Sequence, residues 1–396
     1  MDEVVIVSAA RTAVGRFGGT LCNVPAPELA AVVLKEAVRR AGLEPEQVDE
    51  VVFGHAIANG EAPNAARQAV LLAGFPVEIP AYGVERQCGS GLQAICDATM
   101  QIQTGNAEIV VAGGVESMSS MEYYVTGARW GIRLGSRQFW DRWERQTEMI
   151  STHRFGRVAS MLHTAANVAE KLKISREAQD EFALRSQQKA AAAMAAGRFK
   201  DEIVPVPVPQ KKGDPIMFDT DEHPRPETTL EALAKLKPVV GETITAGNSS
   251  GMNDGAAACV LMTEKKAEKL GLEPMGYMRA WAAAGVHPAY MGLGPVAAVR
   301  KVLKKAGLTL DDMDLIELNE AFAAQALGVI KELGITDLSN LNVNGSGIAL
   351  GHPIAATGAR IMCTLLYEMK RRGARYGLET MCIGGGQGIA AIVERK

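Results

Sequence analysis

The sequence predicts an α/β protein built from two duplicated units, with a long insertion between them. Residues 28–58 and 293–323 share one order of features: an apolar helical period, the tripeptide AGL, an acidic turn and an apolar run typical of a strand. Each unit ends in a strand and a glycine cluster, EIVVAGG at 108–114 and ETMCIGGG at 379–386. Alternating strands and helices favour largely parallel sheets covered by helices, and the repeat indicates a duplication. We therefore expect a site where the strand ends of the two units meet.

The segment between the two units has a different composition. Residues 119–160 are rich in arginine and tryptophan, and a helical stretch at 175–197 follows, with Ser175 as its expected cap. A proline-punctuated run, IVPVPVPQKKGDP, comes next, and an excursion of this length is usually functional. The expected organisation is an N-terminal core half at residues 1–118, completed by 247–270, a loop domain at 119–246, and a C-terminal core half at 271–396.

Size and charge narrow the classes of function. The chain has 396 residues, 47% of them hydrophobic, which suits two or three packed domains. A formal net charge of −3 gives no field that would attract nucleic acid or an anionic membrane. No apolar run reaches the roughly 18 residues of a membrane span, the first residues lack the order of a secretory signal, and the ERK ending differs from a peroxisomal signal. We therefore expect a cytoplasmic protein with no membrane or nucleic-acid partner.

One of the cysteines stands out from the others. Their spacing suggests neither a zinc site nor a disulfide framework, so most are expected to be inert small hydrophobes. Cys88 instead lies in VERQCGSGLQAI, where a glycine-serine-glycine turn leads into an apolar helical pattern. A helix N-terminus favours an anion, so we expect it to lower the pKa of this thiol and make Cys88 a nucleophile. The alternative is a buried, unreactive cysteine at a helix start.

Three further stretches could supply the rest of such a site. His352, among the glycines of GSGIALGHP, could take the thiol proton. Cys382 ends a strand-like run before three glycines, so it could be a second acid/base, and the glycine N–H groups could stabilise an oxyanion. Asn319 lies where an apolar strand turns into a helix and could position a water or an oxygen. The alternative for Asn319 is a simple helix cap.

Two other kinds of motif compete with this interpretation. Ser249 in GNSSG matches the G-x-S-x-G pattern of serine hydrolases, but the preceding GETITAG is too polar for the strand that such a nucleophile needs. The stretches GSGIALG and GGGQG lack the G-x-G-x-x-G spacing of dinucleotide loops, and the P-loop lysine is absent. We therefore disfavour both a serine hydrolase and a nucleotide-binding protein.

Four stretches together resemble the thiolase family, the acyl-CoA C-acyltransferases, over essentially the whole chain. They are CGSGLQA, NEAFAAQA, GSGIALGHP and MCIGGGQGIA, in the family's order. The resemblance implies a five-layered αβαβα core from two related halves, with a loop domain that holds coenzyme A. It implies cleavage of a 3-oxoacyl-CoA by coenzyme A, or the reverse condensation, through a cysteine acyl-enzyme. Coenzyme A would be a co-substrate, with no metal or permanently bound cofactor, in a homo-oligomer of two or four subunits.

The resemblance also implies a role for each motif residue. Cys88 would be the nucleophile, His352 would activate it, and Cys382 would move the proton at the α-carbon of the second acyl-CoA. Asn319 would hold a water that lines one oxyanion hole with His352. The backbone N–H groups of Cys88 and Gly384 would form the other. The implied coenzyme contacts are Arg225, Ser250 and Met291.

The chain departs from the family pattern at several positions. Glu85 stands where the family commonly has asparagine. In the loop domain, Ser160, Leu162 and Ala166 replace a histidine, a glycine and a glutamate, and Ala355 replaces the glycine after GHPI. We therefore expect a bulkier, branched, aromatic or dicarboxylic 3-oxoacyl group, with the arginine-rich segment meeting a second carboxylate. The alternative for that segment is a solvated or subunit-contact face.

Three other functions are weighed against a self-sufficient thiolase. A decarboxylating ketoacyl synthase shares the duplicated fold but pairs its cysteine with two histidines, whereas the third group here is Cys382. A non-catalytic acyl-CoA carrier would fit the altered loop domain. The third is a subunit active only in a hetero-complex, with a hydratase/dehydrogenase or a small zinc-bearing acyl-CoA protein as its partner.

Overall fold

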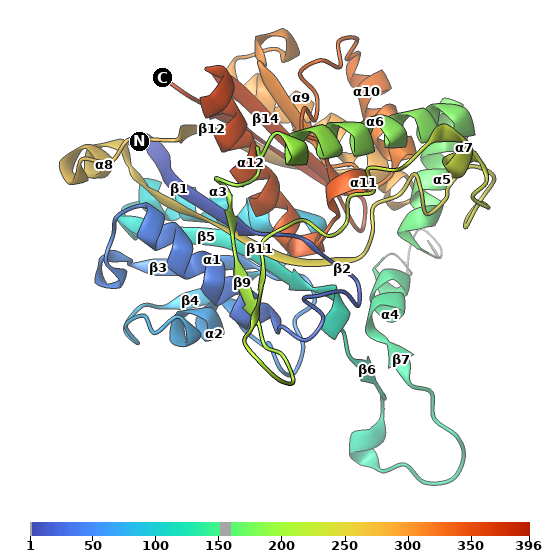
Figure 1. Ribbon diagram of the computed structural model, residues 1–396, viewed down its shortest axis with the longest axis horizontal. Coiled ribbons are helices and arrows are strands. Elements are labelled where there is room, and N and C mark those ends of the chain that lie inside the picture. Colours follow the sequence, from blue (N-terminus) through green and yellow to red (C-terminus); the bar gives the residue numbers. More distant parts are fainter. Residues whose placement is uncertain (1, 151–159) are drawn as a thin grey trace.

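The computed structural model describes residues 2–150 and 160–396, and its main feature is one sheet of eleven strands (Figure 1). Nine strands follow the order β13-β14-β15-β12-β1-β11-β5-β3-β4. The N-terminal half contributes β1 (Val4–Thr12), β3 (Glu50–Gly54), β4 (Ala81–Val84), β5 (Ile109–Ser117) and β11 (Asn253–Thr263). The C-terminal half contributes β12 (Gly276–Gly285), β13 (Leu315–Leu318), β14 (Tyr376–Ile383) and β15 (Gln387–Glu394). Two short strands extend the first half, β2 (Gly15–Arg16) beside β11 and β8 (Ile203–Val204) beside β1.

The two halves of the sheet have the same topology, which confirms the predicted duplication. When the strands of each half are numbered in chain order, the first half reads 3-2-4-5-1 across the sheet, from β4 to β1. The second half reads the same, from an isolated parallel bridge at Leu341 through β13, β14 and β15 to β12. Corresponding strand pairs also run in the same relative directions. One α/β unit is therefore built twice into this chain.

The expectation of largely parallel sheets is wrong. The pairs β3–β4, β3–β5, β13–β14 and β1–β8 are parallel, but every pair in the middle of the sheet, from β14 to β5, is antiparallel. The reason is the connection after the fourth strand of each half. β14 returns directly as β15 through glycines 384–386, and so short a turn can join only antiparallel strands. The insertion occupies the equivalent connection between β5 and β11.

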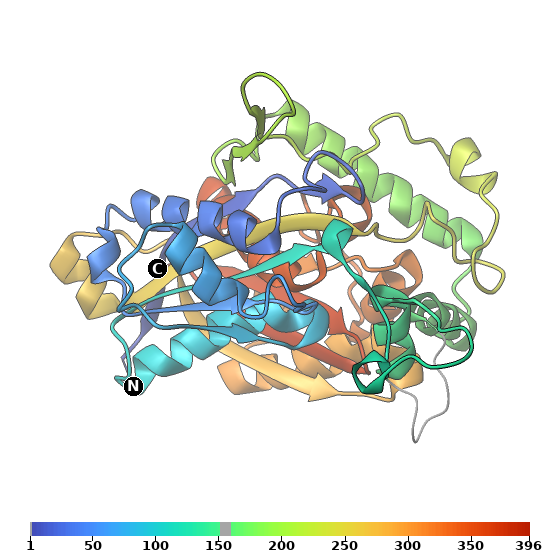
Figure 2. The same ribbon diagram turned by 90° about the horizontal axis from the view of Figure 1, so that it is seen from below.

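Helices cover both faces of each half-sheet and produce five layers (Figures 1 and 2). One hydrophobic cluster joins α1 and α2 to the outer face of the first half, and another joins α9 and α10 to the outer face of the second. A third cluster joins α3 and α12 to the inner faces of both halves, so these helices form the central layer. The helices are α1 (Ala26–Arg40), α2 (Ala65–Leu72), α3 (Ser90–Gln103), α9 (Gly294–Ala306), α10 (Ala323–Leu333) and α12 (Thr357–Arg372). The expected five-layered core is confirmed.

The layers follow from the periodicity of the sequence. Side chains alternate along a strand, so in β1 the residues Val5 and Val7 pack in the outer cluster while Val4 and Ile6 pack in the central one. Such strands are apolar on both faces, as VVIV shows. Burial of both faces fixes the register of each half-sheet, because a slip of one residue would exchange the two faces.

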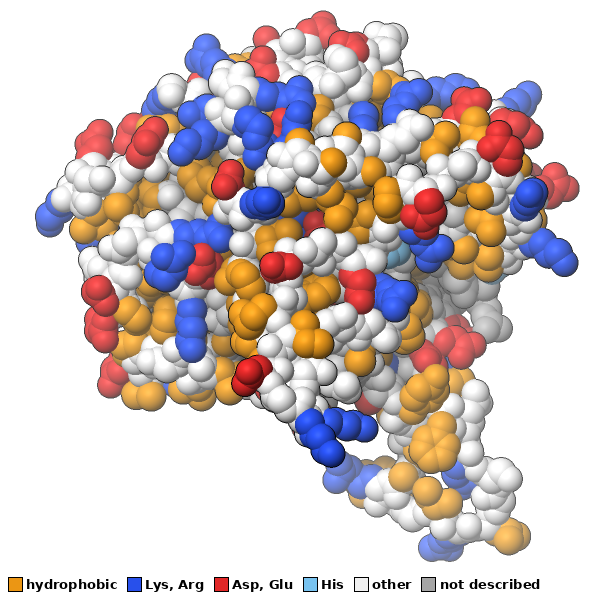
Figure 3. Space-filling model, viewed as in Figure 1, with side chains coloured by type: hydrophobic (Ala, Val, Ile, Leu, Met, Phe, Trp, Pro, Cys, Tyr) orange, Lys and Arg blue, Asp and Glu red, His pale blue; other side chains and the backbone are white. Residues whose placement is uncertain are grey.

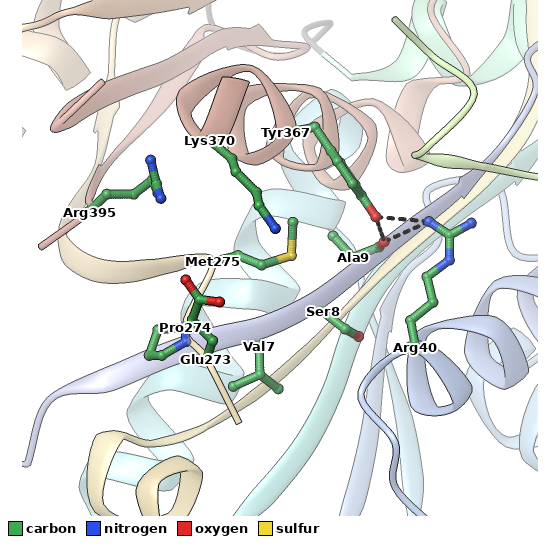
Figure 4. A pocket seen from close by; sticks show the side chains of 10 residues that line it. All are labelled: Val7, Ser8, Ala9, Arg40, Glu273, Pro274, Met275, Tyr367, Lys370 and Arg395. Atoms are coloured by element: carbon green, nitrogen blue, oxygen red, sulfur yellow. Dashed lines mark hydrogen bonds between the residues drawn. The ribbon is translucent and has the colours of Figure 1, made fainter. Parts of the chain in front are cut away.

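The two half-sheets are hydrogen-bonded to each other over a very short length. β1 pairs with β12 at Val5 and Ile6, and the strands then part. A cavity of about 190 Å³ opens there (Figure 4). Arg40 of α1 reaches across its edge, where Nη1 donates to the Ala9 carbonyl at 3.3 Å and to the Tyr367 hydroxyl at 2.9 Å. This contact satisfies part of the open edge of β1 and links α1 to α12.

The insertion leaves the core after β5 and returns at β11. Its first part is an arm that projects from the body and carries exposed apolar side chains, including Trp130, Leu134 and Phe139 (Figures 1 and 3). The elements of the insertion are β6 (Tyr123–Tyr124), β7 (Trp140–Asp141), α4 (Arg142–Met149), α5 (Met161–Leu172), α6 (Arg176–Ala195), β8, β9 (Val206–Val208), β10 (Ile216–Phe218) and α7 (Leu230–Ala234). Two short helices outside it are α8 (Glu264–Leu270) and α11 (Gly347–Leu350). The limits of the three expected parts stay a prediction. Within the described ranges, every helix is too short or too polar to cross a membrane.

A buried arginine fastens the insertion to the core. The Arg11 side chain on β1 is enclosed, and its Nε donates to Glu202 at 2.6 Å. Its Nη1 and Nη2 donate to the two oxygens of Asp221 at 2.7 and 2.9 Å. Both carboxylates belong to the insertion and are buried as well. Paired charges and complete hydrogen bonding make this burial tolerable, so removing one partner is costly.

We predict that Arg11→Met destabilises the protein by about 3–5 kcal/mol, because two buried carboxylates then lose their cation. The urea midpoint of unfolding, followed by circular dichroism, measures the change. Arg39→Ala is the matched control, since Arg39 also pairs with a glutamate at 2.7 Å but lies on the surface. The control should leave the midpoint nearly unchanged. Equal midpoints for R11M and the wild type would contradict the prediction.

Candidate active site

Cys88 is presented at the start of the central helix α3. It lies in a short 3₁₀ turn, η2 (Gln87–Gly89), and α3 begins at Ser90, within the glycine-serine-glycine turn where the sequence predicts the helix to start. The turn is fixed by Ser90, whose Oγ accepts from the Arg86 N–H at 2.8 Å and donates to the Gln87 carbonyl at 2.6 Å. Gln87 has a φ of 45°, a left-handed conformation that is uncommon outside glycine. The thiol direction therefore depends on a constrained loop.

The glycines around Cys88 allow the two halves of the core to approach each other. A Cβ added at Gly91 would lie 2.6 Å from the Ala355 carbonyl oxygen. One added at Gly89 would lie 2.6 Å from Cδ1 of Ile383. Both distances are too short for real contacts, so the small residues of CGSG are required by packing of the C-terminal half against this loop.

His352 comes from the C-terminal half and is held on three sides. Its N–H donates to Asn253 Oδ1 at 2.8 Å, and its Nδ1 lies 2.6 Å from the Thr357 hydroxyl. The Asn319 amide lies 3.4 Å from the same ring nitrogen. Because Nδ1 is engaged by Thr357, Nε2 is the nitrogen available for exchange with a substrate or thiol.

Cys382 lies at the end of β14, directly before the glycine turn. Its side chain is buried. The backbone N–H of Gly384, in that turn, is directed toward the sulfur of Cys88, as is the N–H of Cys88 itself. The turn of the C-terminal half therefore reaches the nucleophile candidate of the N-terminal half.

One cavity of about 220 Å³ connects these groups. Five of the predicted residues line it: Cys88, Ser250, Met291, His352 and Cys382. Asn319 contacts the cavity through His352, and Gly384 through Cys88. Arg225 is elsewhere, on the surface of the insertion, with its backbone N–H bound to Gln187 at 2.8 Å. Ser249 points away, since its hydroxyl donates to the Thr245 carbonyl at 2.7 Å.

Sequence reasoning missed several side chains that shape the cavity. Trp143 and Thr147 come from α4, Met161 begins α5, and Phe322 follows Asn319 by three residues. Phe322 could have been predicted, because it lies within the motif NEAFAAQA. The residues of α4 could not, because nothing in an arginine- and tryptophan-rich segment indicates which face of a helix turns inward. Thr357, the partner of His352, was also missed.

Burial makes the resting site electrically neutral. Loss of hydration raises the pKa of Cys88 to about 11, and this effect exceeds the opposite influence of the Gly384 and Cys88 N–H groups. Burial also raises the pKa of Cys382 well above its ordinary range and lowers the pKa of His352 to about 3. The expectation that the helix start lowers the Cys88 pKa is therefore wrong for the resting site. A helix terminus supplies too little stabilisation to replace the lost water.

The cavity wall has little charge. The described residues that line it include no lysine, arginine, aspartate or glutamate. Arg142 and Arg145 of the insertion line a separate open cleft with Glu85 and Gln87. Two further arginines of the arginine-rich segment, Arg154 and Arg157, lie outside the described residues. Among the described part of the chain, no cluster of three histidine, cysteine or acidic side chains could hold a metal ion.

A thiol, a neutral imidazole and a second thiol around an apolar cavity are the groups that covalent acyl transfer can use, which indicates the class of acyltransferases. Residues 4–265 match the thiolase N-terminal domain, and residues 272–395 match the thiolase C-terminal domain. The chain belongs to the thiolase family.

Similar proteins cover the chain from end to end. The acetyl-CoA acetyltransferase of Cupriavidus necator is 52% identical over 400 residues, which is 100% of both chains. That of Shinella zoogloeoides is 49% identical over 98% of both chains. The crystal structure of the Bacillus anthracis acetyl-CoA acetyltransferase has a TM-score of 0.96 at 48% identity, covering 100% of this chain and 99% of that one. Human mitochondrial 3-ketoacyl-CoA thiolase has a TM-score of 0.94 at 42% identity with the same coverage.

We predict that His352 makes folding stability fall in mild acid. The unfolded chain protonates this histidine below its ordinary pKa of 6.5, whereas the folded protein resists protonation down to about 3. The contribution of His352 to the free energy of unfolding is thus fully present above pH 6.5. Below that pH it falls by roughly 1.4 kcal/mol per pH unit, so about 2 kcal/mol is lost at pH 5. His352→Gln should flatten the urea midpoint between pH 6.5 and 5 relative to the wild type. Parallel pH profiles for the two proteins would refute the prediction.

Proposed function

We propose that this thiolase is an acetyl-CoA C-acetyltransferase, which cleaves acetoacetyl-CoA with coenzyme A to two acetyl-CoA and catalyses the reverse condensation. The observation that carries the proposal is the single apolar cavity where Cys88 of one half meets His352 and Cys382 of the other. The names of the similar proteins support the acetyl group. A buried site with two thiols and an imidazole suits a reaction that needs a soft nucleophile and proton transfer.

In the first half-reaction, the Cys88 sulfur attacks the C3 carbonyl while its proton passes to Nε2 of His352. This transfer is needed because Cys88 rests as a thiol, and His352 can accept the proton because it rests neutral. The C2–C3 bond then breaks, and an acetyl group stays on Cys88. The electron pair of the broken bond forms the enolate of acetyl-CoA. Cys382 donates its proton to that enolate, and acetyl-CoA leaves.

In the second half-reaction, the thiol of coenzyme A gives its proton to the Cys382 thiolate and attacks the acetyl group on Cys88. The second acetyl-CoA leaves, and Cys88 recovers its proton from His352. Each side chain therefore returns to its starting state. The condensation is the same series of steps in reverse order.

Two groups of donors would stabilise the oxyanions of these steps. The N–H groups of Gly384 and Cys88, which point to the Cys88 sulfur, suit an oxygen on the carbon bound to it. On the other side, Oδ1 of Asn319 is buried without a hydrogen-bond partner in the described structure. An unsatisfied buried oxygen beside His352 supports a bound water at the second position.

The structure gives no support to a bulky, aromatic or dicarboxylic acyl group. Leu162, which replaces a family glycine, lines the cavity with Trp143 and Phe322, so it takes up space instead of opening it. No cationic side chain among the described lining residues faces a second carboxylate. These observations favour a small acyl group.

Coenzyme A and self-association complete the proposal. Ser250 and Met291 line the cavity and suit the end of the pantetheine arm, while the exposed Arg225 suits a nucleotide phosphate outside it. The projecting arm exposes 96% of Leu134 and 85% of Trp130, an apolar surface that a homo-oligomer would cover.

We expect Cys88→Ala to abolish both turnover and the acetyl-enzyme, because no sulfur remains to carry the group. Cys382→Ala should form the acetyl-enzyme from acetyl-CoA but lose at least 10²-fold in thiolysis of acetoacetyl-CoA, since the enolate step lacks its proton carrier. Mass spectrometry of the quenched enzyme locates the acetyl group, and thiolysis of acetoacetyl-CoA measures turnover. An acetyl group on another residue, or an active C88A enzyme, would disprove the assignment.

Leu162→Ala should relax selectivity toward longer acyl groups, because it removes apolar volume from the cavity. We expect the ratio of kcat/KM for 3-oxohexanoyl-CoA to that for acetoacetyl-CoA to rise about tenfold, the worth of one or two buried methylenes. Leu184→Ala is the control, since that leucine packs in the outer core and is absent from the cavity wall. An unchanged ratio in L162A would show that another surface sets the acyl length.

A further inference from the structure

The residue before the nucleophile candidate is held in an unfavourable backbone conformation. Gln87 has a φ of 45°, which is left-handed and costs about 1–3 kcal/mol for a side chain of this kind. Such a conformation persists only where neighbouring contacts hold it. The direction of the Cys88 thiol follows from this turn, because the two residues are adjacent within η2.

Glu85 supplies those contacts with one oxygen. Its Oε1 accepts from the backbone N–H of Gln87 at 2.8 Å and from the side-chain Nε2 of Gln87 at 2.7 Å. The other end of the Gln87 amide, Oε1, accepts from Gln146 of α4 at 3.2 Å. The Gln87 side chain also covers Gly384, where an added Cβ would lie 3.6 Å from its Cγ. Glu85 thus fixes a residue that touches the insertion and the glycine turn of the opposite half.

Glu85 also carries a charge near the thiol. Its described contacts include no salt bridge, and the carboxylate is exposed in the cleft that Arg142 and Arg145 line. The other ionisable groups around Cys88 are Glu116 on β5, which pairs with His55 at 3.3 Å, and His352 and Cys382 in the cavity. Both Glu85 and Glu116 act to raise the pKa of Cys88.

We propose that Glu85 is a positioning residue for the thiolase reaction: it locks the left-handed turn at Gln87, aims Cys88 into the cavity, and places a negative charge beside the thiol. The inference rests on the proposed role of Cys88. The carboxylate therefore stabilises the turn, but its charge makes the thiolate of Cys88 harder to form.

Two substitutions separate the geometric role from the charge. Glu85→Gln keeps an Oε1 that can accept both bonds but removes the charge, so most of kcat should remain and Cys88 should react with iodoacetamide at lower pH than in the wild type. Glu85→Ala removes the acceptor, so kcat for acetoacetyl-CoA should fall about tenfold with little change in KM. Peptide mass spectrometry of alkylated Cys88 across pH and steady-state thiolysis provide the two readouts.

A second-site variant tests the turn itself. Gln87→Gly adopts a left-handed φ without strain, so adding it to E85A should restore several-fold of the lost kcat. Glu122→Gln is the charge control, because Glu122 pairs with Arg142 at 3.6 Å and makes no bond to Gln87. The Glu122→Gln variant should show the same pH dependence of Cys88 alkylation as the wild type.

The proposal fails if E85A turns over as the wild type does, if E85Q is as impaired as E85A, or if E85Q leaves the alkylation profile unshifted. Alkylation needs no substrate, so this arm still tests Glu85 if the wild type cleaves no 3-oxoacyl-CoA. A failure of the proposed function is therefore distinct from a failure of this inference.

Discussion

The whole arrangement depends on the close approach of the two central helices. A Cβ added at Gly358 of α12 would lie 2.5 Å from the Leu92 nitrogen of α3, and one at Gly91 would meet the Ala355 carbonyl at 2.6 Å. Backbone therefore lies against backbone where the two halves join. Cys88 precedes one of these helices and His352 the other, so any side chain at these glycines would separate the reactive groups as well as the helices.

This close packing also determines how protons must move. Because the junction excludes bulk solvent, it disfavours charge: burial raises the pKa of both thiols and lowers the pKa of the imidazole. An ion pair at rest would be costly to bury and would gain little until a substrate arrives. The same exclusion strengthens the N–H groups that face a developing oxyanion. A neutral resting site with preorganised donors is thus a direct consequence of the junction.

The repeat in the sequence predicted the duplication, and the apolar periodicity predicted a helix start near residues 89–91, whereas the five layers were implied by the resemblance to the thiolase family. The sequence also predicted Cys88, His352 and Cys382 in one cavity, because motifs at the ends of equivalent elements meet when the halves pack, while the resemblance added Ser250 and Met291. The parallel sheet was wrong because strand direction depends on connections, and a turn of three glycines outweighs the helical crossovers around it. The prediction of a lowered pKa for Cys88 was wrong because the burial of this thiol arises from residues distant in the sequence, Trp143 and Phe322 among them. The inward faces of α4 and α5 had no local signal.

The duplicated hairpins explain how one fold unit serves two roles. In the C-terminal half the connection between the fourth and fifth strands is a bare glycine turn, and its Gly384 N–H reaches Cys88 of the N-terminal half. In the N-terminal half the equivalent connection is the insertion, and its return point, Asn253, accepts the N–H of His352 from the C-terminal half. Each hairpin end therefore holds the candidate reactive residue of the other half. The short turn keeps the glycines that we propose as oxyanion donors, and the insertion in the equivalent place supplies cavity walls through Trp143, Thr147 and Met161.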